Sequence, residues 1–292
     1  MNNLPDISPE LPVLIAGPTA AGKSALALGI ARKSGGMIIN ADALQVYDGW
    51  RILTARPSAK EEAQAQHHLY GHVSYKHDYS VGHWLRDVAA LLIASDQRPI
   101  IVGGTGLYFR AMTEGLAEIP NISQSVRKEA DVLLETEGLP SLLNTLDEKS
   151  RQRIDTRNPA RVQRAWEVLR ETGKGLADWQ DETPPPILPL RKTFPIIIDA
   201  EREWLNDRIE QRFDAMIEAG ALEEARSMLA DWDPARLSSK AIGAPELIAH
   251  LNGKLDLDVA IENAKTASRQ YAKRQRTWFR ARMTNWHPYP LP

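Results

Sequence analysis

The stretch Gly17-Pro18-Thr19-Ala20-Ala21-Gly22-Lys23-Ser24 fits the pattern G-x-x-x-x-G-K-[ST], which is typical of a phosphate-binding loop. An apolar run at 11–16 precedes it and predicts a buried strand, and the pattern at 25–33 predicts a helix. Glycines let the N–H groups of such a loop converge on one point, where the helix N-terminus adds partial positive charge. We therefore expect a di- or triphosphate site, with Lys23 neutralising phosphate charge and Ser24 holding Mg²⁺.

The composition is that of an ordinary globular protein, with 292 residues, 43% hydrophobic, 25% charged and a net charge of −2. Any attraction to nucleic acid must therefore come from a local basic surface. The absence of cysteine excludes thiolate metal sites, and the adjacent His67 and His68 favour a surface position because their side chains point in different directions. Residues 1–12 lack the features of a secretory signal, and no uncharged run is long enough for a bilayer. We expect a cytoplasmic monomer without a membrane segment.

Two polar side chains are expected at the same edge of a parallel sheet as the loop. The run at 37–40 predicts a buried strand that ends just before Asp42. The segment 98–108 predicts a strand, a glycine turn that holds Thr105, and the start of a helix. Ligands bind outside the carboxyl ends of parallel strands, so Asp42 and Thr105 would lie beside the phosphate site. A solvated loop aspartate and a helix-capping threonine are the structural alternatives.

The pattern along the chain predicts an α/β fold with a P-loop NTPase-like parallel sheet, a helical insertion and C-terminal helices. We expect the first part of the core at 1–120, the insertion at 121–190, and the rest of the core at 191–292, beginning with a strand at 194–199. The predicted helices after the first lie at 80–93, 125–137, 139–149, 159–172, 201–219, 222–230 and 257–282.

Two segments gather positive charge. Arg157, Arg161 and Arg164 share one face of a helix in the insertion. Past Glu262 the chain has no acidic residue, whereas Lys and Arg recur up to Arg282 among aromatic rings. Such a surface is typical of polyanion binding, with rings that stack on unpaired bases. The alternatives are a solvated face paired with carboxylates and a helix packed across the acidic middle of the chain.

Several motifs, taken in this order, resemble those of the tRNA dimethylallyltransferases, also called tRNA isopentenyltransferases. The resemblance covers nearly the whole length and, besides the loop, includes the segments 40–47 (NADALQVY), 54–58 (TARPS), 67–69 (HHL), 102–108 (VGGTGLY), 158–168 and 269–280. Three positions depart from the family's pattern. Ala43 replaces a serine, Leu53 replaces a glycine, and Ala244-Pro245 replaces a Tyr-Lys pair. The loop, Asp42 and Thr105 are not affected.

The resemblance implies transfer of a dimethylallyl group from dimethylallyl pyrophosphate to N6 of the adenosine 3′ of the anticodon, position 37. The tRNAs would be those that read codons beginning with U, and Mg²⁺ would assist the departure of pyrophosphate. Asp42 would accept the amine proton, and Thr105 would hydrogen-bond the reacting centre or the bridging oxygen. The residues implied in binding the tRNA anticodon stem-loop are Asp42, Ala43, Leu44, Gln45, Thr105, Arg127, Arg161, Val162, Gln163, Arg164, Ala165, Lys273, Arg274, Gln275, Arg276, Thr277, Trp278, Phe279 and Arg280.

Three rival functions fit parts of the sequence. An ATP-dependent phosphotransferase would need only the loop, and the sequence leaves open whether ATP binds there. A prenyltransferase acting on free adenine nucleotides would need neither basic segment. A nucleotide-gated RNA-binding protein without chemistry would not need a proton acceptor such as Asp42 beside the loop.

Overall fold

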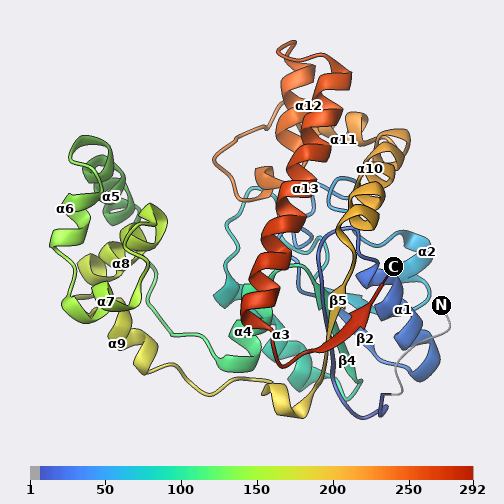
Figure 1. The fold of residues 1–292 in the computed structure, drawn as a ribbon, viewed down its shortest axis with the longest axis horizontal. Coiled ribbons are helices and arrows are strands. Elements are labelled where there is room, and N and C mark those ends of the chain that lie inside the picture. The colour runs from blue at the N-terminus through green and yellow to red at the C-terminus, as the bar shows by residue number, and fades with distance from the viewer. Residues whose placement is uncertain (1–6, 292) are drawn as a thin grey trace. The chain divides into compact units, whose positions relative to one another are not determined.

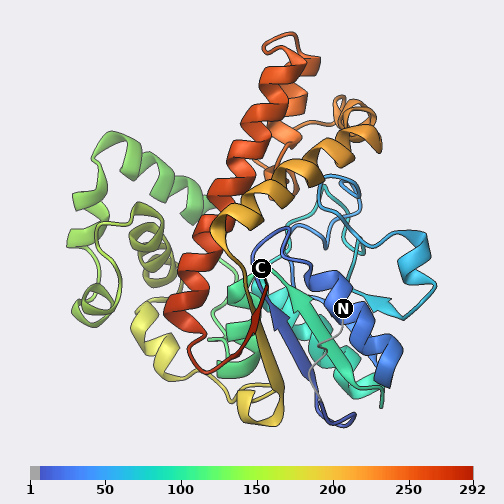
Figure 2. The same ribbon diagram turned by 45° about the vertical axis from the view of Figure 1, so that its right-hand side comes forward.

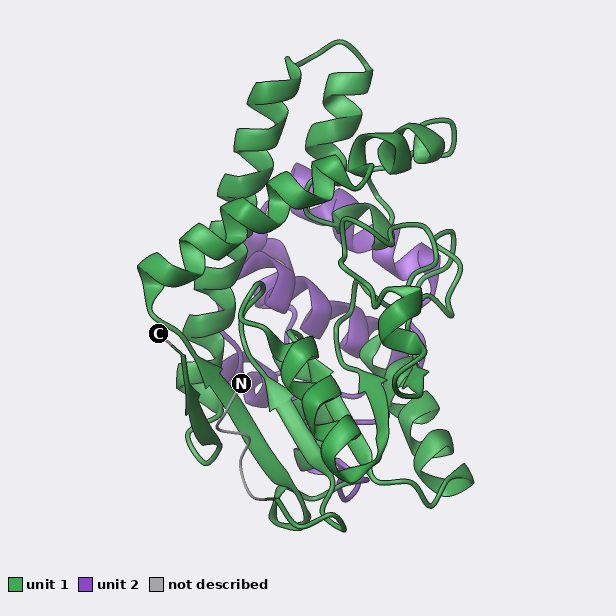
Figure 3. Cartoon of the chain, turned by 90° about the vertical axis from the view of Figure 1, so that its right-hand side faces the viewer, with its two compact units in different colours: residues 1–113, 188–292 green, residues 114–187 purple. Residues whose placement is uncertain are grey.

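The computed structural model describes residues 7–291, and these fold into two compact units, coloured separately in Figure 3. Unit 1 contains the chain up to Thr113 and again from Leu188, and unit 2 consists of residues 114–187. Most of the segment 121–190, for which the sequence predicts helices, lies within unit 2.

Within the described residues, unit 1 is organised around a six-stranded sheet in which all neighbouring strands are parallel (Figures 1 and 2). The order across the sheet is β3-β2-β4-β1-β5-β6. The strands are β1 (Val13–Ala16), β2 (Met37–Asn40), β3 (His67–His68), β4 (Pro99–Gly103), β5 (Phe194–Asp199) and β6 (His287–Pro290). Strand β1 lies inside the sheet, with Ile15 opposite Val102 of β4 and Ile196 of β5. The predicted α/β fold is confirmed.

The two edge strands were not predicted from the sequence. Strand β3 consists of His67 and His68, which pair with β2 and are half-buried, so the prediction of a plain surface position is corrected. Strand β6 contains Pro288 and Pro290, which cannot donate a backbone hydrogen bond and are tolerated at a sheet edge. Strand β5 has the predicted bounds.

The helices that begin in unit 1 are α1 (Lys23–Ser34), α2 (Ala59–Glu62), α3 (Val81–Ala94), α4 (Gly106–Glu114), α10 (Arg202–Glu218), α11 (Ala221–Met228), α12 (Ala244–Leu251) and α13 (Leu257–Arg282), with short 3-10 turns η1 (Leu190–Lys192) and η2 (Ser238–Lys240). Ser80 caps α3 as predicted, because its hydroxyl accepts a hydrogen bond from the N–H of His83. Helices α10 and α13 pack side by side (Figure 2), and α13 has the bounds predicted from its pattern.

Alternating apolar residues on each strand bury both faces of the sheet. On β1, Val13 and Ile15 face α1 and the first turns of α10, whereas Leu14 faces α3, α4 and the end of α13. A third apolar cluster joins α10, α11, α12 and the first half of α13, and it includes Trp50 and Leu53 from the loop after β2. The α10–α13 group is therefore fixed to the same rim of the sheet as the loops that follow the strands.

Unit 2 is all helical in its described part. Its helices are α5 (Gln124–Thr136), α6 (Leu139–Asn144), α7 (Glu148–Arg153), α8 (Pro159–Thr172) and α9 (Leu176–Asp181). Helix α8 has the predicted bounds, with the Asn158 side chain as its N-cap and Gly173 in the left-handed conformation at its C-terminus. The single helix predicted at 139–149 is wrong. The chain forms two helices there because Asp147 caps α7, its Oδ1 accepting from the Ser150 N–H at 2.8 Å.

Candidate active site

Among residues 7–291, the first N–H groups of α1 have no hydrogen-bond acceptor. The N-cap residue Gly22 has a φ of 78° and supplies no side-chain cap. Because the first turn of a helix has no intrahelical acceptors, the N–H groups of Lys23 and Ser24 remain available to an anion. Ala20 also has a positive φ of 62°, which a residue with a side chain rarely adopts. The loop thus presents backbone donors as an anion site requires, and phosphate binding by residues 17–24 stays a prediction.

Lys23 lies across this loop, with its Nζ donating to the Pro18 carbonyl at 2.7 Å. Burial lowers the pKa of Lys23 to about 8, while the charge of Asp42 acts to raise it and that of Arg212 lowers it further. Lys23 is therefore close to Asp42 and Arg212, and an anion bound between these residues would favour the charged form of Lys23.

A cavity of about 430 Å³ opens beside the loop and lies wholly within unit 1. Its polar lining includes the loop, Asp42, Gln45 and two arginines of α10, Arg208 and Arg212, together with Arg56 and Glu61. Its apolar lining includes Leu53, Ile209, Phe213, Met216 and Ile242. One cavity therefore combines charged side chains, which suit phosphates, with apolar side chains, which suit a hydrocarbon.

Arg208 and Arg212 are site residues that the sequence reasoning missed. Arg208 Nε donates to the carbonyl of Ala20 in the loop at 3.1 Å. The pKa of Arg212 is lowered by burial, while Asp42 opposes this and Arg208 adds to it. The sequence contains one indication of them, an arginine pair one helical turn apart in the helix that follows the strand at 194–199. The structure turns both toward the loop, so with Lys23 they place three cations around one anion site.

Asp42 is held by Asn40 at the end of β2. Its N–H donates to Asn40 Oδ1 at 2.8 Å, and Asn40 Nδ2 donates to its carbonyl at 3.0 Å. Its Oδ1 accepts from the Leu44 N–H at 3.0 Å. Its Oδ2 lies over Gly104, where an added methyl carbon would approach it to 3.2 Å, and the residue lines the cavity. One carboxylate oxygen is thus fixed and the other is left to accept a proton.

Thr105 joins the loop after β4 to the loop after β2. Its Oγ1 accepts from the Ala43 N–H at 2.9 Å, and its own N–H donates to the Ala41 carbonyl at 3.1 Å. The structure therefore brings Thr105 and Asp42 together at the rim, as predicted. The hydroxyl hydrogen of Thr105 has no partner among residues 7–291, so it remains able to donate.

The rest of the segment after β2 supports the cavity wall. Leu44 and Gln45 both line the cavity. Gln45 Nε2 donates to the carbonyls of Thr54 at 2.8 Å and Ala55 at 3.1 Å. Gln45 thereby fixes the loop 50–56, and its side-chain oxygen remains available as an acceptor.

Gln275 of α13 is not a surface residue, which corrects the expectation that its side chain contacts tRNA. It is 6% exposed, its Oε1 accepts from the Thr19 N–H at 2.8 Å, and its Nε2 donates to the Gly104 carbonyl at 3.0 Å. Phe279 is 4% exposed and belongs to the apolar core, so it cannot stack on a base. These two side chains hold α13 against the sheet and the loop.

The outer face of α13 keeps most of the expected cations free. Lys273, Arg274 and Arg280 are exposed, Arg276 is half-buried, and none has an ion pair within the described chain. Thr277 and Trp278 lie on the same helix, beside Lys273 and Arg274, and line a shallow groove. Earlier in the helix the prediction of free charge is wrong, because Lys265 pairs with Asp214 at 2.8 Å and Arg269 pairs with Glu210 at 2.8 Å.

The residues of α8 that were expected to bind tRNA lie on two faces of the helix, one buried within unit 2 and one exposed. Val162 and Ala165 are fully buried, so their expected contact with tRNA is corrected to a packing role. Arg161 is exposed and has no ion pair in the described residues. Burial lowers the pKa of Arg164, Glu167 opposes this, and the charge of Arg127 on α5 adds to it. Arg127, Arg161 and Arg164 thus form a basic face on α5 and α8, in which Arg164 also contacts Glu167 at 3.8 Å.

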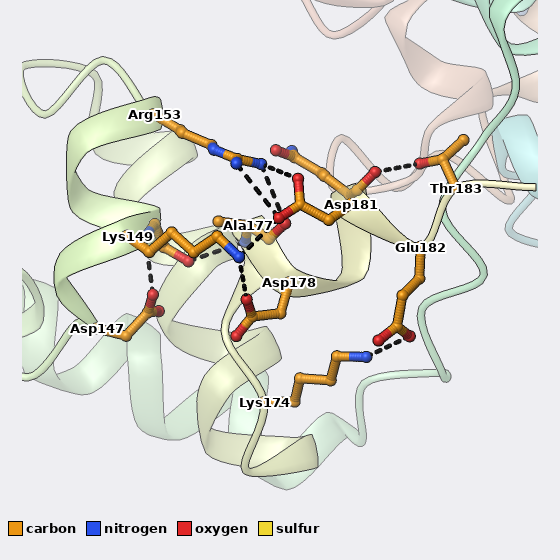
Figure 4. A network of polar contacts seen from close by, with 11 residues as sticks. Asp147, Lys149, Arg153, Lys174, Ala177, Asp178, Asp181, Glu182 and Thr183 are labelled. Carbon is orange, nitrogen blue, oxygen red and sulfur yellow. Dashed lines mark hydrogen bonds and ion pairs between the residues drawn. The ribbon is translucent and has the colours of Figure 1, made fainter.

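Several other charges of unit 2 are paired within it. Lys149 contacts Asp178 and Asp181 at 2.5 and 2.6 Å, and Arg153 donates to Asp181 at 2.5 Å (Figure 4). Gln163 Nε2 donates to Asp131 Oδ1 at 2.7 Å, which commits part of that side chain. The alternative of pairing with carboxylates holds in part for the predicted arginine face itself, because Arg157 contacts Asp155 at 3.7 Å and Arg164 contacts Glu167 at 3.8 Å. Arg157 also lies before the start of α8 at Pro159, so the prediction that it shares a helix face with Arg161 and Arg164 is wrong.

Metal binding by side chains alone is not supported. Among the residues that the structure describes, no three His, Cys, Asp or Glu side chains are placed to hold a metal ion. Mg²⁺ commonly uses one or two protein oxygens together with substrate phosphates and water. The Ser24 hydroxyl, exposed and without a hydrogen bond in the described chain, fits that pattern. No helix within residues 7–291 is both long and apolar enough to cross a membrane.

The fold and the site together define an α/β group transferase with a phosphate-binding loop. Two family models match the chain, one described as IPP transferase over residues 45–282 and one described as isopentenyl transferase over residues 12–71. A tRNA dimethylallyltransferase of Cereibacter sphaeroides is 62% identical over 286 residues, covering 98% of each chain. A tRNA dimethylallyltransferase of Ruegeria sp. is 60% identical and also covers 98% of each chain.

Solved structures agree. The full-length tRNA isopentenylpyrophosphate transferase from Bacillus halodurans is 33% identical with a TM-score of 0.68, covering 96% of this chain and 90% of that one. A eukaryotic dimethylallyltransferase, described as acting on tRNA, is 25% identical with a TM-score of 0.80, covering 96% and 73%. The chain therefore belongs to the family of tRNA dimethylallyltransferases, which are prenyl-transferring enzymes. The resemblance of its motifs to this family is confirmed.

Proposed function

We propose that unit 1 transfers a dimethylallyl group from dimethylallyl pyrophosphate to N6 of adenosine 37 in tRNAs that read codons beginning with U. One observation carries this proposal. A single cavity is lined by the phosphate-binding loop, four cations including Lys23, Arg208 and Arg212, the Asp42 carboxylate and apolar side chains. Pyrophosphate suits the loop and the cations, a reacting amine suits the Asp42 carboxylate, and a five-carbon hydrocarbon suits the apolar side chains.

The pyrophosphate is held by the N–H groups of the loop and by Lys23, Arg208 and Arg212. These donors surround the oxygens on which negative charge grows as the donor's C1–O bond breaks, so they stabilise the transition state more than the ground state. Ser24 would hold Mg²⁺ beside those oxygens, and the ion would supply further charge neutralisation. The loop alone would also accept the phosphates of ATP, but the apolar side chains of the cavity favour a prenyl donor.

The acceptor is activated by Asp42. As the C1–O bond breaks and the N6–C1 bond forms, the carboxylate takes one N6 proton, and pyrophosphate leaves. Thr105 donates its free hydroxyl hydrogen to the bridging oxygen, which eases departure of that oxygen. The hydrogen bond from the Ala43 N–H to Thr105 Oγ1 joins Thr105 to the residue after Asp42. It therefore keeps the Asp42 carboxylate and the Thr105 hydroxyl at a fixed position relative to each other.

Each unit supplies a basic surface for RNA. In unit 1 it is the outer face of α13, with Lys273, Arg274, Arg276 and Arg280; in unit 2 it is the α5–α8 face. The four cations of α13 and Arg161 of α8 have no ion pair within the described residues, so they are able to bind phosphates, and Trp278 offers a ring beside those of α13. The protein would act in the cytoplasm, and it would act there as a monomer because the exposed large apolar residues of the described chain are scattered singly.

The test is transfer from radiolabelled dimethylallyl pyrophosphate to a synthetic anticodon stem-loop with unpaired adenosines at positions 36 and 37. Label should enter this RNA and should be absent when position 37 is guanosine. Equal transfer to AMP would support the free-nucleotide rival. Release of ADP from ATP in the presence of a metabolite panel, without prenyl transfer, would support the phosphotransferase rival.

A further inference from the structure

Arg208 is held at the phosphate-binding loop although its charge and exposure favour the solvent. It is exposed, whereas Lys23 and Arg212 are half-buried, and it forms no ion pair within residues 7–291. Arg212 lies one helical turn further along α10, and the two like charges repel each other. An arginine side chain has many rotamers, so in these surroundings it extends into water unless other contacts hold it.

The guanidinium of Arg208 makes two contacts, one with the loop and one with a ring on its own helix. Its Nε donates to the Ala20 carbonyl at 3.1 Å. Its central carbon, Cζ, lies over the ring of Trp204, 4.8 Å from the ring centre. The negative face of an indole ring attracts a guanidinium, which also stacks on it. Neither contact uses the two terminal nitrogens, Nη1 and Nη2, so within the described chain their N–H groups remain available to a phosphate.

Trp204 is itself fixed and lies outside the cavity. Its ring is half-buried and packs against the apolar cluster that includes Ala20, Leu205 and Ile209. Arg208 and Ala20 line the cavity, but Trp204 does not. Trp204 and Arg208 are four residues apart in the sequence, the spacing at which two side chains of a helix meet. The ring therefore acts on a ligand in the cavity through Arg208.

We propose that Trp204 is a positioning residue: its ring holds the Arg208 guanidinium beside the loop, ready to bind the pyrophosphate of the donor. This inference rests on the proposed function, which gives Arg208 that role. Because the arginine side chain is ordered before the donor arrives, less conformational entropy is lost on binding. The same should hold for inorganic pyrophosphate alone, since it also places a diphosphate at Arg208.

The test measures pyrophosphate affinity in matched variants. Trp204→Leu removes the ring face but keeps an apolar side chain, and Trp204→Phe restores a ring. Trp179→Leu is the control, because Lys174 Nζ lies 4.5 Å from the centre of that ring, which belongs to unit 2 and does not line the cavity. Calorimetry with each purified protein gives the Kd of inorganic pyrophosphate, and the KM for dimethylallyl pyrophosphate is measured at saturating stem-loop RNA. Thermal melting checks folding.

We expect Trp204→Leu to raise both constants roughly two- to fivefold, the factor that a cation–π contact at an exposed site provides. Trp204→Phe should restore most of the affinity, and Trp179→Leu should leave both constants unchanged. Arg208→Ala should raise them further. In an Arg208→Ala background, Trp204→Leu should then have no effect, because the ring has no guanidinium left to hold.

An unchanged pyrophosphate Kd in folded Trp204→Leu, or an equal loss of affinity when the change is made in the Arg208→Ala background, would overturn the inference alone. If Trp204→Leu does not fold, Trp204→Met fills more of the same space without a ring face and replaces it in both backgrounds. No transfer of a dimethylallyl group by the unchanged protein would overturn the proposed function itself, whatever the pyrophosphate Kd of the variants.

Discussion

Gln275 and Thr19 are joined by a hydrogen bond of 2.8 Å from the loop N–H of Thr19 to the side-chain oxygen of Gln275, across 256 positions of sequence. The other half of the same amide donates to the carbonyl of Gly104, the residue directly after β4. One buried side chain of α13 therefore touches both the phosphate-binding loop and the loop that carries Thr105. The helix whose outer face is basic thus also positions the catalytic rim.

We predict that Gln275→Leu lowers stability by about 1–3 kcal/mol, because the Thr19 N–H and the Gly104 carbonyl lose their partners. The KM for dimethylallyl pyrophosphate should rise, since Thr19 belongs to the phosphate-binding loop, while RNA affinity should change little. Gln270→Leu is the matched control, because Gln270 is exposed on the same helix. Thermal melting, KM and filter binding of RNA measure the three effects. A loss of RNA affinity without loss of stability would mean that Gln275 reads the RNA directly.

Asp42→Asn should fold, bind both substrates and lose most transfer. The change removes a charge but almost no volume, and asparagine Oδ1 can still accept from Leu44. Because asparagine cannot take the N6 proton, the single-turnover rate should fall by roughly a hundred- to ten-thousand-fold. Thr105→Ala should cost less, because one hydrogen bond is lost. Near-normal single-turnover transfer by Asp42→Asn would reduce Asp42 to a residue that only orients the base.

The pKa of Lys23 predicts a pH dependence of donor binding. Burial places this pKa at about 8 in the free protein, and a bound pyrophosphate favours the charged amine. Affinity should therefore fall as pH rises through 8, by about tenfold between pH 7 and pH 9, as the charged fraction falls. Lys23→Arg keeps its charge, so its profile should follow only the donor's own ionisation, and comparison with it isolates the effect of Lys23. Parallel profiles in the two proteins, measured by calorimetry, would contradict the assignment.

Arg274→Ala and Arg280→Ala should weaken tRNA binding because both cations are exposed and have no ion pair within residues 7–291. Each should also reduce the slope of log affinity against log salt by about one unit or less, as a lost phosphate contact does. Turnover at saturating tRNA should stay unchanged. Arg269→Ala is the control, since Arg269 is already paired with Glu210. If Arg269→Ala reduced the salt slope as much as the other two, the free face of α13 would not be the RNA surface.

Local patterns were enough to predict the parts of the fold that depend on short-range physics. The strand at 194–199 and the helices at 159–172 and 257–282 have their predicted bounds, because their periodic apolar residues and end signals agree. The break between α6 and α7 was missed, because an aspartate inside a helical pattern reveals itself as a cap only through its own backbone geometry.

Long-range contacts decided what the sequence could not show. Gln275 looks like part of a basic, exposed run, yet its partners lie at positions 19 and 104. Arg208 and Arg212 resemble an ordinary pair on an amphipathic helix until the fold turns them toward the loop. Asp42 and Thr105, in contrast, could be placed in advance, because the carboxyl ends of parallel strands meet at one edge.

The central claim is that this chain prenylates tRNA, with Asp42 as the proton acceptor. The most direct test is mass spectrometry of tRNA nucleosides from cells that lack the gene, complemented either with the unchanged chain or with Asp42→Asn at equal expression. We expect N6-dimethylallyladenosine, or products derived from it, with the unchanged chain and almost none with the variant. Absence of the nucleoside with the unchanged chain, or equal amounts with both, would contradict the claim.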